Sequence, residues 1–164
     1  MTLLALDMAT NTGWCCGDVR HGKPVLGSIK LPSTKKDLGW WMDAAIKEYD
    51  ELIAHTHPDR VRYESPILRG STRIETLRKL YTLASVIEYV CRDRNIPVYE
   101  VAITTVKKRL TGNGRAQKED MMKAAEGMGM APKSHDEADA FGIWLTGAYK
   151  FAPEEALRFE DLLI

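Results

Sequence analysis

Short apolar runs separated by turn residues fill the first part of the chain. Residues 2–7 form a mostly apolar run that ends in Asp7, and residues 13–19 and 25–31 contain two more short runs. Strands this short and this closely spaced are typical of an antiparallel meander. The pattern therefore predicts three strands that pair in chain order.

Longer segments with apolar residues at intervals of three and four follow this meander, and this spacing predicts helices. Their ranges are about 35–55, 71–94, 104–110, 117–128 and 136–150. Two further runs, residues 61–65 and 96–102, are predicted to be strands. The order of elements predicts an α/β fold: a mixed five-stranded sheet, with an antiparallel meander of three strands plus two parallel strands, and helices on both faces. We expect residues 1–164 to form a single domain.

Composition excludes several classes of protein. The chain is 45% hydrophobic and 28% charged, and no stretch approaches the roughly 20 apolar residues of a membrane helix or resembles a secretory signal. Cys15 and Cys16 are adjacent and Cys91 is alone, which suits neither a disulfide framework nor a metal site. We therefore expect a cytoplasmic protein without a membrane partner.

Charge is balanced overall but unevenly distributed. The net charge is zero, which argues against a protein that coats nucleic acid indiscriminately. Residues 60–79 nevertheless hold six Lys or Arg against two Glu, and residues 103–118 hold five without any acidic residue. Two such segments on one face would grip an anion. The alternative is that both are solvated surfaces of helices and loops.

Four carboxylates fall where this fold would bring them together. Asp7 ends the first strand and Glu64 lies near the end of the fourth, and sites in open α/β sheets form beyond the carboxyl ends of parallel strands. If these two strands are parallel neighbours, both side chains lie at one edge of the sheet. Asp136 and Asp139, three residues apart, share one face of the last helix. Hard divalent cations are the counter-charge that such oxygen ligands favour, and a pair of Mg²⁺ ions would hydrolyse a phosphodiester.

Each carboxylate also has an ordinary structural role open to it. The helix dipole alone would favour Asp136 in a first helical turn. Asp139 is harder to explain in this way, because the residues after it are apolar and buried charges are rarely left unpaired. The ordinary partners of the other two lie nearby in the sequence: Arg60 or Arg62 for Glu64, and Thr10 or Thr12 for Asp7.

Together, the four carboxylates resemble the acidic tetrad of the RuvC-type Holliday junction resolvases, members of the ribonuclease H-like superfamily. Residues 106–121 are similar to that family's segment in which a Val-Lys pair is followed by Gly-x-Gly-x-Ala-x-Lys. In this chain the segment contains Gly112, Gly114, Ala116 and Lys118. The resemblance spans nearly the whole chain, with the motifs in the family's order and at its spacings.

The resemblance implies a homodimer that binds four-way DNA junctions and cuts two strands symmetrically with Mg²⁺ or Mn²⁺, with two ions at each site. By position, Asp7, Glu64, Asp136 and Asp139 would be the metal ligands, and Lys118 would face the scissile phosphate. The helix over residues 71–94 would supply the dimer contact. The residues expected to contact DNA are Arg69, Arg73, Lys107, Lys108, Arg109, Arg115 and Lys118.

Two departures from the family's pattern concern the substrate. The first aspartate of the family is usually followed by Pro-Gly, and here by Met8-Ala9. Where the family commonly has an aromatic wedge after the glutamate, this chain offers Ile67 or Leu68, which stack less well on bases. We therefore expect junction selectivity or sequence preference to differ, as in a divergent relative from a virus or mobile element.

Three other functions remain open at this point. One keeps the fold and the metals but acts on branched replication DNA or on a ribosomal RNA precursor. A second is a sugar-kinase-like or acetate-kinase-like fold, whose phosphate loop also has an Asp followed by Thr and Gly, as in DMATNTG. Such enzymes usually need two domains, for which 164 residues leave little room. The third is a DNA-binding module without catalysis, which would gain nothing from carboxylates that face phosphate.

Overall fold

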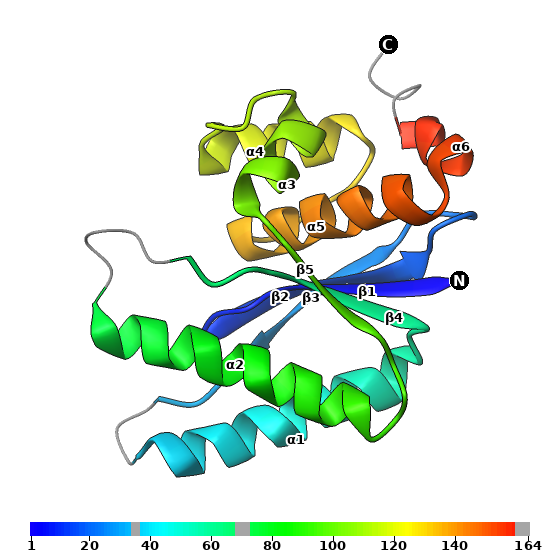
Figure 1. Ribbon diagram of the computed structural model, residues 1–164. Helices are drawn as coiled ribbons and strands as arrows, with labels where there is room; N and C mark the ends of the chain where they lie inside the picture. Colours follow the sequence, from blue (N-terminus) through cyan, green and yellow to red (C-terminus); the bar gives the residue numbers. More distant parts are fainter. Residues whose placement is uncertain (34–36, 68–72, 160–164) are drawn as a thin grey trace.

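A computed structural model of the chain describes residues 1–33, 37–67 and 73–159. Its centre is one five-stranded sheet in the order β3-β2-β1-β4-β5 (Figure 1). The strands are β1 (Thr2–Asp7), β2 (Asn11–Asp18), β3 (Val25–Lys30), β4 (Arg60–Glu64) and β5 (Val98–Val101). The first three pair antiparallel in chain order, and β4 is parallel to both β1 and β5. The predicted mixed sheet is therefore confirmed.

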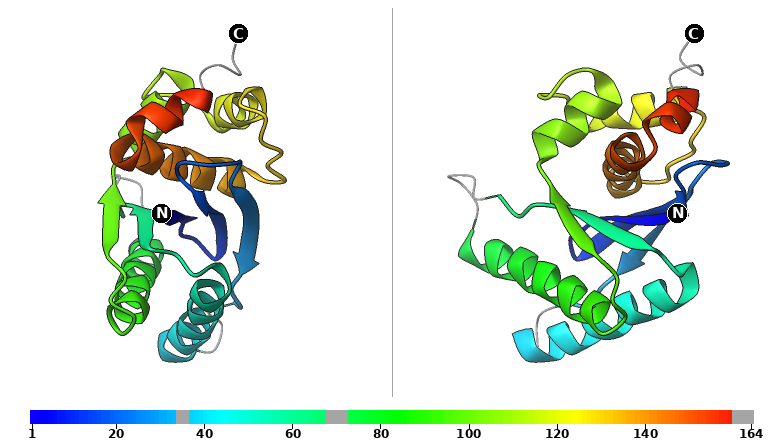
Figure 2. Two further views of the ribbon diagram at one scale, coloured as in Figure 1. Left: turned by 90° about the vertical axis from the view of Figure 1, so that its right-hand side faces the viewer. Right: turned by 45° about the vertical axis from the view of Figure 1, so that its right-hand side comes forward.

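Helices cover both faces of the sheet, as predicted (Figures 1 and 2). On one face lie α1 (Leu38–Thr56) and α2 (Ile74–Arg92), which pack against each other. On the other lie α3 (Ile103–Thr111), α4 (Lys118–Gly127) and α5 (His135–Phe151), and α5 crosses β1 and β2. No helix among the described residues is long and apolar enough to span a membrane.

A short α6 (Pro153–Ala156) and a 3-10 turn (Leu157–Phe159) were not predicted from the sequence. Pro153 stands at the first position of α6, which proline favours because its missing N–H would be unpaired there. The ring of Phe159 meets those of Phe141 and Trp144 edge-on, at centroid distances of 5.8 and 5.7 Å. The segment after α5 is therefore part of the apolar core under that helix, although its acidic residues make it look like a solvated tail.

The start of α5 rests directly on the backbone of β2. Gly13 of β2 pairs with Asp7 of β1, and a Cβ atom built at Gly13 would overlap the carbonyl oxygen and carbon of Asp136. The helix can approach the sheet this closely only because position 13 has no side chain. This contact fixes the height of the first turn of α5 above the end of β1.

One buried charge is incompletely paired within the described part of the chain. Arg62 of β4 is 4% exposed, and its Nε and Nη1 atoms have no hydrogen-bond partner among the described residues. Loss of solvation lowers the pKa of this guanidinium. A buried, incompletely paired cation opposes folding.

We expect Arg62→Met to raise the free energy of unfolding, by about 1–3 kcal/mol, because an apolar side chain of similar length removes the desolvation cost. The measurement is urea denaturation followed by circular dichroism. Arg20→Met provides the control, since the Arg20 side chain is 58% exposed and its change is expected to stay within about 0.5 kcal/mol. A loss of stability in Arg62→Met would mean that the guanidinium is paired.

Candidate active site

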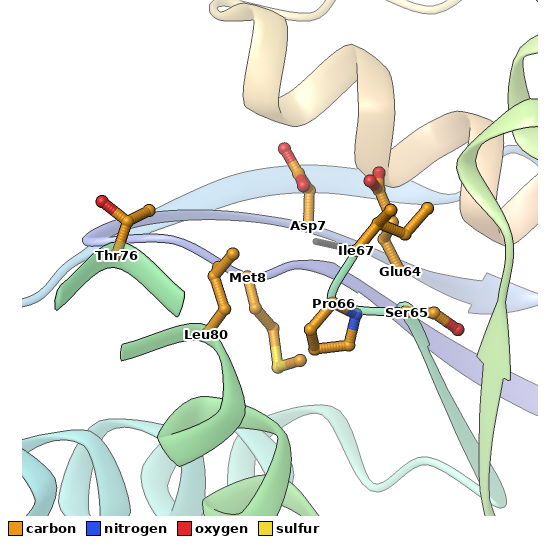
Figure 3. A pocket seen from close by; sticks show the side chains of 8 residues that line it. All are labelled: Asp7, Met8, Glu64, Ser65, Pro66, Ile67, Thr76 and Leu80. Atoms are coloured by element: carbon orange, nitrogen blue, oxygen red, sulfur yellow. The ribbon is translucent and has the colours of Figure 1, made fainter. Parts of the chain in front are cut away.

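The parallel pairing of β1 and β4 brings two carboxylates to one edge of the sheet. Leu6 and Tyr63 are aligned across these strands, so the next residues, Asp7 and Glu64, end them side by side. Both side chains are half-buried. In Figure 3 both carboxylates rise from the strand ends toward the face that α5 covers.

Local hydrogen bonds fix where α5 begins and so place the other two carboxylates. The Ser134 hydroxyl caps the helix by accepting the backbone N–H of Glu137 at 3.2 Å. The Glu137 carboxylate accepts the backbone N–H of Lys133 at 2.8 Å, which ties the preceding loop to the first turn. Asp136 and Asp139 then lie in the first two turns, both half-buried.

All four predicted carboxylates line one cavity of about 290 Å³. The remaining lining residues are Ala9, Ile103, Lys107, Lys118 and Met121. Within the described ranges, no three His, Cys, Asp or Glu side chains are gathered closely enough, as they stand, to hold a metal ion. The side chains thus share a cavity without converging on one point, as expected of like charges that repel one another.

The cavity contains more negative than positive charge, since four carboxylates and two lysines line it. Burial raises the pKa of Asp7 well above its usual value, and the charges of Asp139, Glu64 and Asp136 raise it further, against a smaller opposite effect of Lys118. Burial also raises the pKa of Asp139, and here Lys118 and Lys107 oppose it. Divalent cations bound by carboxylate oxygens would supply the missing charge, so the donor set fits Mg²⁺ or Mn²⁺.

Asn11, which was not predicted from the sequence, forms a hydrogen bond with one of the four carboxylates. Its side-chain amide donates a hydrogen bond to Oδ2 of Asp136 at 2.5 Å, across 125 positions of sequence. The bond leaves Oδ1 of Asp136 for other interactions. Ligand-orienting hydrogen bonds of this kind are typical of metal sites. The only sequence signal was the position of Asn11 in the polar turn that follows Asp7.

Thr12, rather than Asp7, closes the turn that follows β1. The Thr12 hydroxyl donates to the carbonyl of Ala9 at 2.8 Å and accepts its N–H at 3.3 Å, which closes the turn. The Tyr49 hydroxyl lies 3.0 Å from the same oxygen. Asp7 is therefore not needed to close this turn.

Arg60 and Arg62 were the two ion-pair partners suggested for Glu64, and the structure shows a different environment for each. Arg60 donates from Nη1 to the Tyr99 hydroxyl at 2.8 Å, and its guanidinium lies over the ring of Phe151 at 4.7 Å. Arg62 has two nitrogen atoms without hydrogen-bond partners in the described part of the chain. Arg60 is thus engaged by two aromatic side chains of its own surroundings.

Of the predicted basic residues that the structure describes, two line the carboxylate cavity. Lys118 is exposed at the first position of α4, and Lys107 donates from Nζ to the carbonyl of Ala116 at 2.6 Å. Lys108 and Arg109 line a separate hollow of about 500 Å³. The Arg109 guanidinium stacks over Tyr149, 4.1 Å from the ring centroid.

Two further residues predicted to contact DNA, Arg115 and Arg73, do not line the cavity. Arg115 is exposed in the loop before α4, and Arg73 is exposed immediately before α2. Arg69 lies outside the described residues, as does Leu68, whereas Ile67 is 41% exposed beside Glu64.

The strand order, with carboxylates at the ends of β1 and β4 and on the helix that crosses β1, defines a protein of the ribonuclease H-like class. No family model matches the chain. Two curated relatives are crossover junction endodeoxyribonucleases RuvC. The one from Chlorobium chlorochromatii is 32% identical over 153 aligned positions, which cover 88% of this chain and 78% of the relative. The one from Chlorobium phaeovibrioides is 29% identical over 170 positions, covering 99% and 88%.

Two solved structures share the fold. RuvC of Thermus thermophilus in complex with a Holliday junction substrate matches with a TM-score of 0.78 at 20% identity, over 94% of this chain and 97% of that one. The yeast mitochondrial Holliday junction resolvase Ydc2 matches with a TM-score of 0.61 at 16% identity, over 98% and 79%. The chain belongs to the RuvC family of crossover junction endodeoxyribonucleases. The resemblance inferred from the sequence is therefore confirmed.

Proposed function

We propose that this protein is a metal-dependent, structure-selective DNA endonuclease that resolves four-way (Holliday) junctions by paired, symmetric nicks. The observation that supports it most is the cavity that Asp7, Glu64, Asp136 and Asp139 line together with two lysines, in a chain of this family. A DNA-binding module would gain nothing from four carboxylates that face phosphate. The enzyme is expected to act in the cytoplasm.

The four carboxylates would hold two divalent ions, Mg²⁺ or Mn²⁺. When bound, such ions activate the attacking water and stabilise the leaving oxygen of a phosphodiester. The chain itself contributes the orientation of its ligands, since Asn11 fixes one oxygen of Asp136 and the Ser134 cap fixes the start of α5. Lys118, exposed at the cavity, is suited to neutralise the charge that develops on the phosphoryl oxygens.

DNA outside the cavity would follow the remaining basic residues. Lys108, Arg109 and Arg115 lie on the segment from α3 to α4, and Arg73 precedes α2. Contacts of this kind position the backbone of the DNA and carry no sequence information. Arg69 completes the proposed set by its place in the sequence.

Two symmetric nicks require two sites, and we propose a homodimer. The first half of α2 supports this arrangement, because Ile74 is 69% exposed and Tyr81 is 49% exposed. Large exposed apolar side chains on one helix favour a protein contact. Farther along α2, Ala84 is buried in the core of its own chain and is not available for such a contact.

The proposed function is tested by incubating the protein with a labelled four-way junction, a Y-fork, a linear duplex and a stem-loop RNA, with Mg²⁺ and with EDTA. We expect paired nicks in opposing strands of the junction, in Mg²⁺ only. Preferential cutting of the fork or the RNA would contradict junction resolution. Tight junction binding without any cutting would contradict the metal site.

We expect Asn11→Ala to weaken Mg²⁺ binding and cleavage by about 10- to 100-fold, because Asp136 loses the bond that orients it. Mn²⁺ binding followed by electron paramagnetic resonance measures the effect without activity. Equal metal affinity in the wild type and Asn11→Ala would show that this bond does not position the carboxylate.

A further inference from the structure

The turn between β1 and β2 carries two groups of the carboxylate cavity. Asp7 ends β1 and Asn11 begins β2, so only residues 8–10 lie between them. Ala9, in the middle of this turn, lines the cavity. Residues 8–11 include neither Gly nor Pro, so no restriction or freedom of their backbone imposes the shape of the turn. Its shape therefore depends on the groups to which its backbone is bonded.

The Thr12 hydroxyl bonds this turn on one side and a helix on the other. It donates to the carbonyl of Ala9 at 2.8 Å and accepts the N–H of Ala9 at 3.3 Å. A hydroxyl has one proton, which the carbonyl takes, so the Tyr49 hydroxyl, 3.0 Å away, donates to the remaining lone pair of Thr12. The hydrogen-bonding capacity of Thr12 is thus fully used in joining the turn to α1.

The Tyr49 side chain is a firm support for this bond. Tyr49 belongs to α1, which covers the face of the sheet opposite to α5 (Figure 1). Tyr49 and Thr12 are both 0% exposed, and the Tyr49 ring is part of the apolar core under α1. Burial raises the pKa of Tyr49, Thr12 partly opposes the rise, and the charge of Asp7 adds to it. The hydroxyl therefore keeps the proton that it donates.

The pleat of β2 carries the effect of this support to the other face of the sheet. Successive side chains of a strand point to opposite faces, so Thr12 points toward α1 and Asn11 toward α5. The Asn11 amide donates to Asp136 of α5 at 2.5 Å. The residue after Thr12, Gly13, pairs with Asp7. Support from α1 below the sheet thus fixes groups on both sides of the carboxylate cavity above it.

We propose that Tyr49 and Thr12 are positioning residues for the metal ligands of the carboxylate cavity. Neither would touch the ion, and both act through the turn that carries Asp7 and Asn11. This inference rests on the proposed function, in which the cavity binds divalent metal. Ligands that repel one another lose freedom when an ion gathers them, and a turn that is already fixed reduces that loss.

The test compares Mn²⁺ affinity, followed by electron paramagnetic resonance, at a temperature where circular dichroism shows each variant to be folded. Thr12→Val removes the hydroxyl at nearly constant volume and should lower the affinity by about 10- to 100-fold. Thr12→Ser keeps the hydroxyl and should stay within about threefold of the wild type. Tyr49→Phe removes one hydrogen bond and should lower the affinity by about 2- to 12-fold. Thr146→Val is the matched control, because its buried hydroxyl donates to the carbonyl of Gly142 within α5.

Single-turnover cleavage of a four-way junction over a range of Mn²⁺ concentrations gives a second readout. The concentration for half-maximal rate should rise in Thr12→Val by the same factor as the affinity falls. Equal Mn²⁺ affinity in the wild type and Thr12→Val would overturn the inference, even if the variant melts at a lower temperature. Weaker binding by Thr12→Ser than by Thr12→Val would overturn it too, since packing of the methyl group would then matter more than the hydroxyl. A wild type that binds Mn²⁺ but cuts no junction, with affinity lost in Thr12→Val, would contradict the proposed function and leave the positioning role supported.

Discussion

Asp7→Asn is expected to lower junction cleavage by about 10³-fold or more, while junction binding changes by less than about threefold. Burial raises the pKa of Asp7, and the charges of Asp139, Glu64 and Asp136 raise it further, so this carboxylate is the one whose charge most needs a cation. Asparagine keeps the shape of the side chain and removes the charge that a divalent ion needs. Single-turnover cleavage and a gel-shift assay on the same labelled junction measure the two effects.

The same substitution should stabilise the metal-free protein at neutral pH. The pKa of Asp7 is raised in the folded chain, so the folded state binds a proton more tightly than the unfolded state does. The resulting contribution to stability is present below the unfolded pKa of about 3.9 and is lost as pH rises through the folded pKa. In EDTA at pH 7, Asp7→Asn should therefore melt at a higher temperature than the wild type, and the difference should shrink as the pH is lowered toward 4.

Asp43→Asn, on the exposed face of α1, is the matched control and should change neither cleavage nor melting. Cleavage retained by Asp7→Asn would contradict the assignment of the active site. A lower melting temperature in EDTA would mean that the Asp7 charge is compensated within the metal-free protein.

The carboxylate cavity was predictable from the sequence because each of its members stands at a position that backbone geometry fixes. Asp7 and Glu64 end strands, and parallel neighbours must end at the same edge of the sheet. Asp136 and Asp139 are three positions apart, slightly less than one helical turn, which places them on one face of the helix. Only the adjacency of β1 and β4 had to be assumed, and the observed strand order confirms it.

What could not be predicted depends on contacts between side chains that are far apart in sequence. Asn11 meets Asp136 only after β2 and α5 have packed together, and no local pattern marks it as a donor. A hollow beside the same strand ends likewise brings Met8 together with Leu80 of α2. Such sites appear only when the packing of the elements is known.

The basic segment from α3 to α4 shows that a run of charged residues in the sequence does not indicate which of them face the cavity. Its five Lys and Arg residues look equivalent as a run, but α3 turns by 100° per residue and separates neighbours. Lys107 thus faces the carboxylate cavity, whereas Lys108 and Arg109 line another hollow. Helical phase, rather than charge density, decides which cation faces the carboxylate cavity.

Gly13→Ala is expected to destabilise the protein by about 2–4 kcal/mol and to lower cleavage by about 100-fold or more in the molecules that remain folded. The added methyl group would overlap the carbonyl of Asp136, which is backbone and has no rotamer to escape into. The helix cannot simply move outward, because α5 is buried along most of its length by the apolar core beneath α3, α4 and α6. Urea denaturation and single-turnover cleavage, at a temperature where the variant is folded, measure the two effects.

Gly39→Ala provides the matched control, because Gly39 is exposed in α1 and the nearest atom to an added methyl group is a side-chain oxygen of Asp37 at 3.3 Å. Alanine favours the helix by up to about 1 kcal/mol, so this variant should be as stable as the wild type or more so, with unchanged cleavage. Equal cleavage by Gly13→Ala and the wild type would show that the height of α5 above β1 does not control the carboxylates. Loss of cleavage with normal Mn²⁺ binding would place the defect in the approach of DNA to the cavity, and loss of both would place it in the spacing between Asp7 and the first turn of α5.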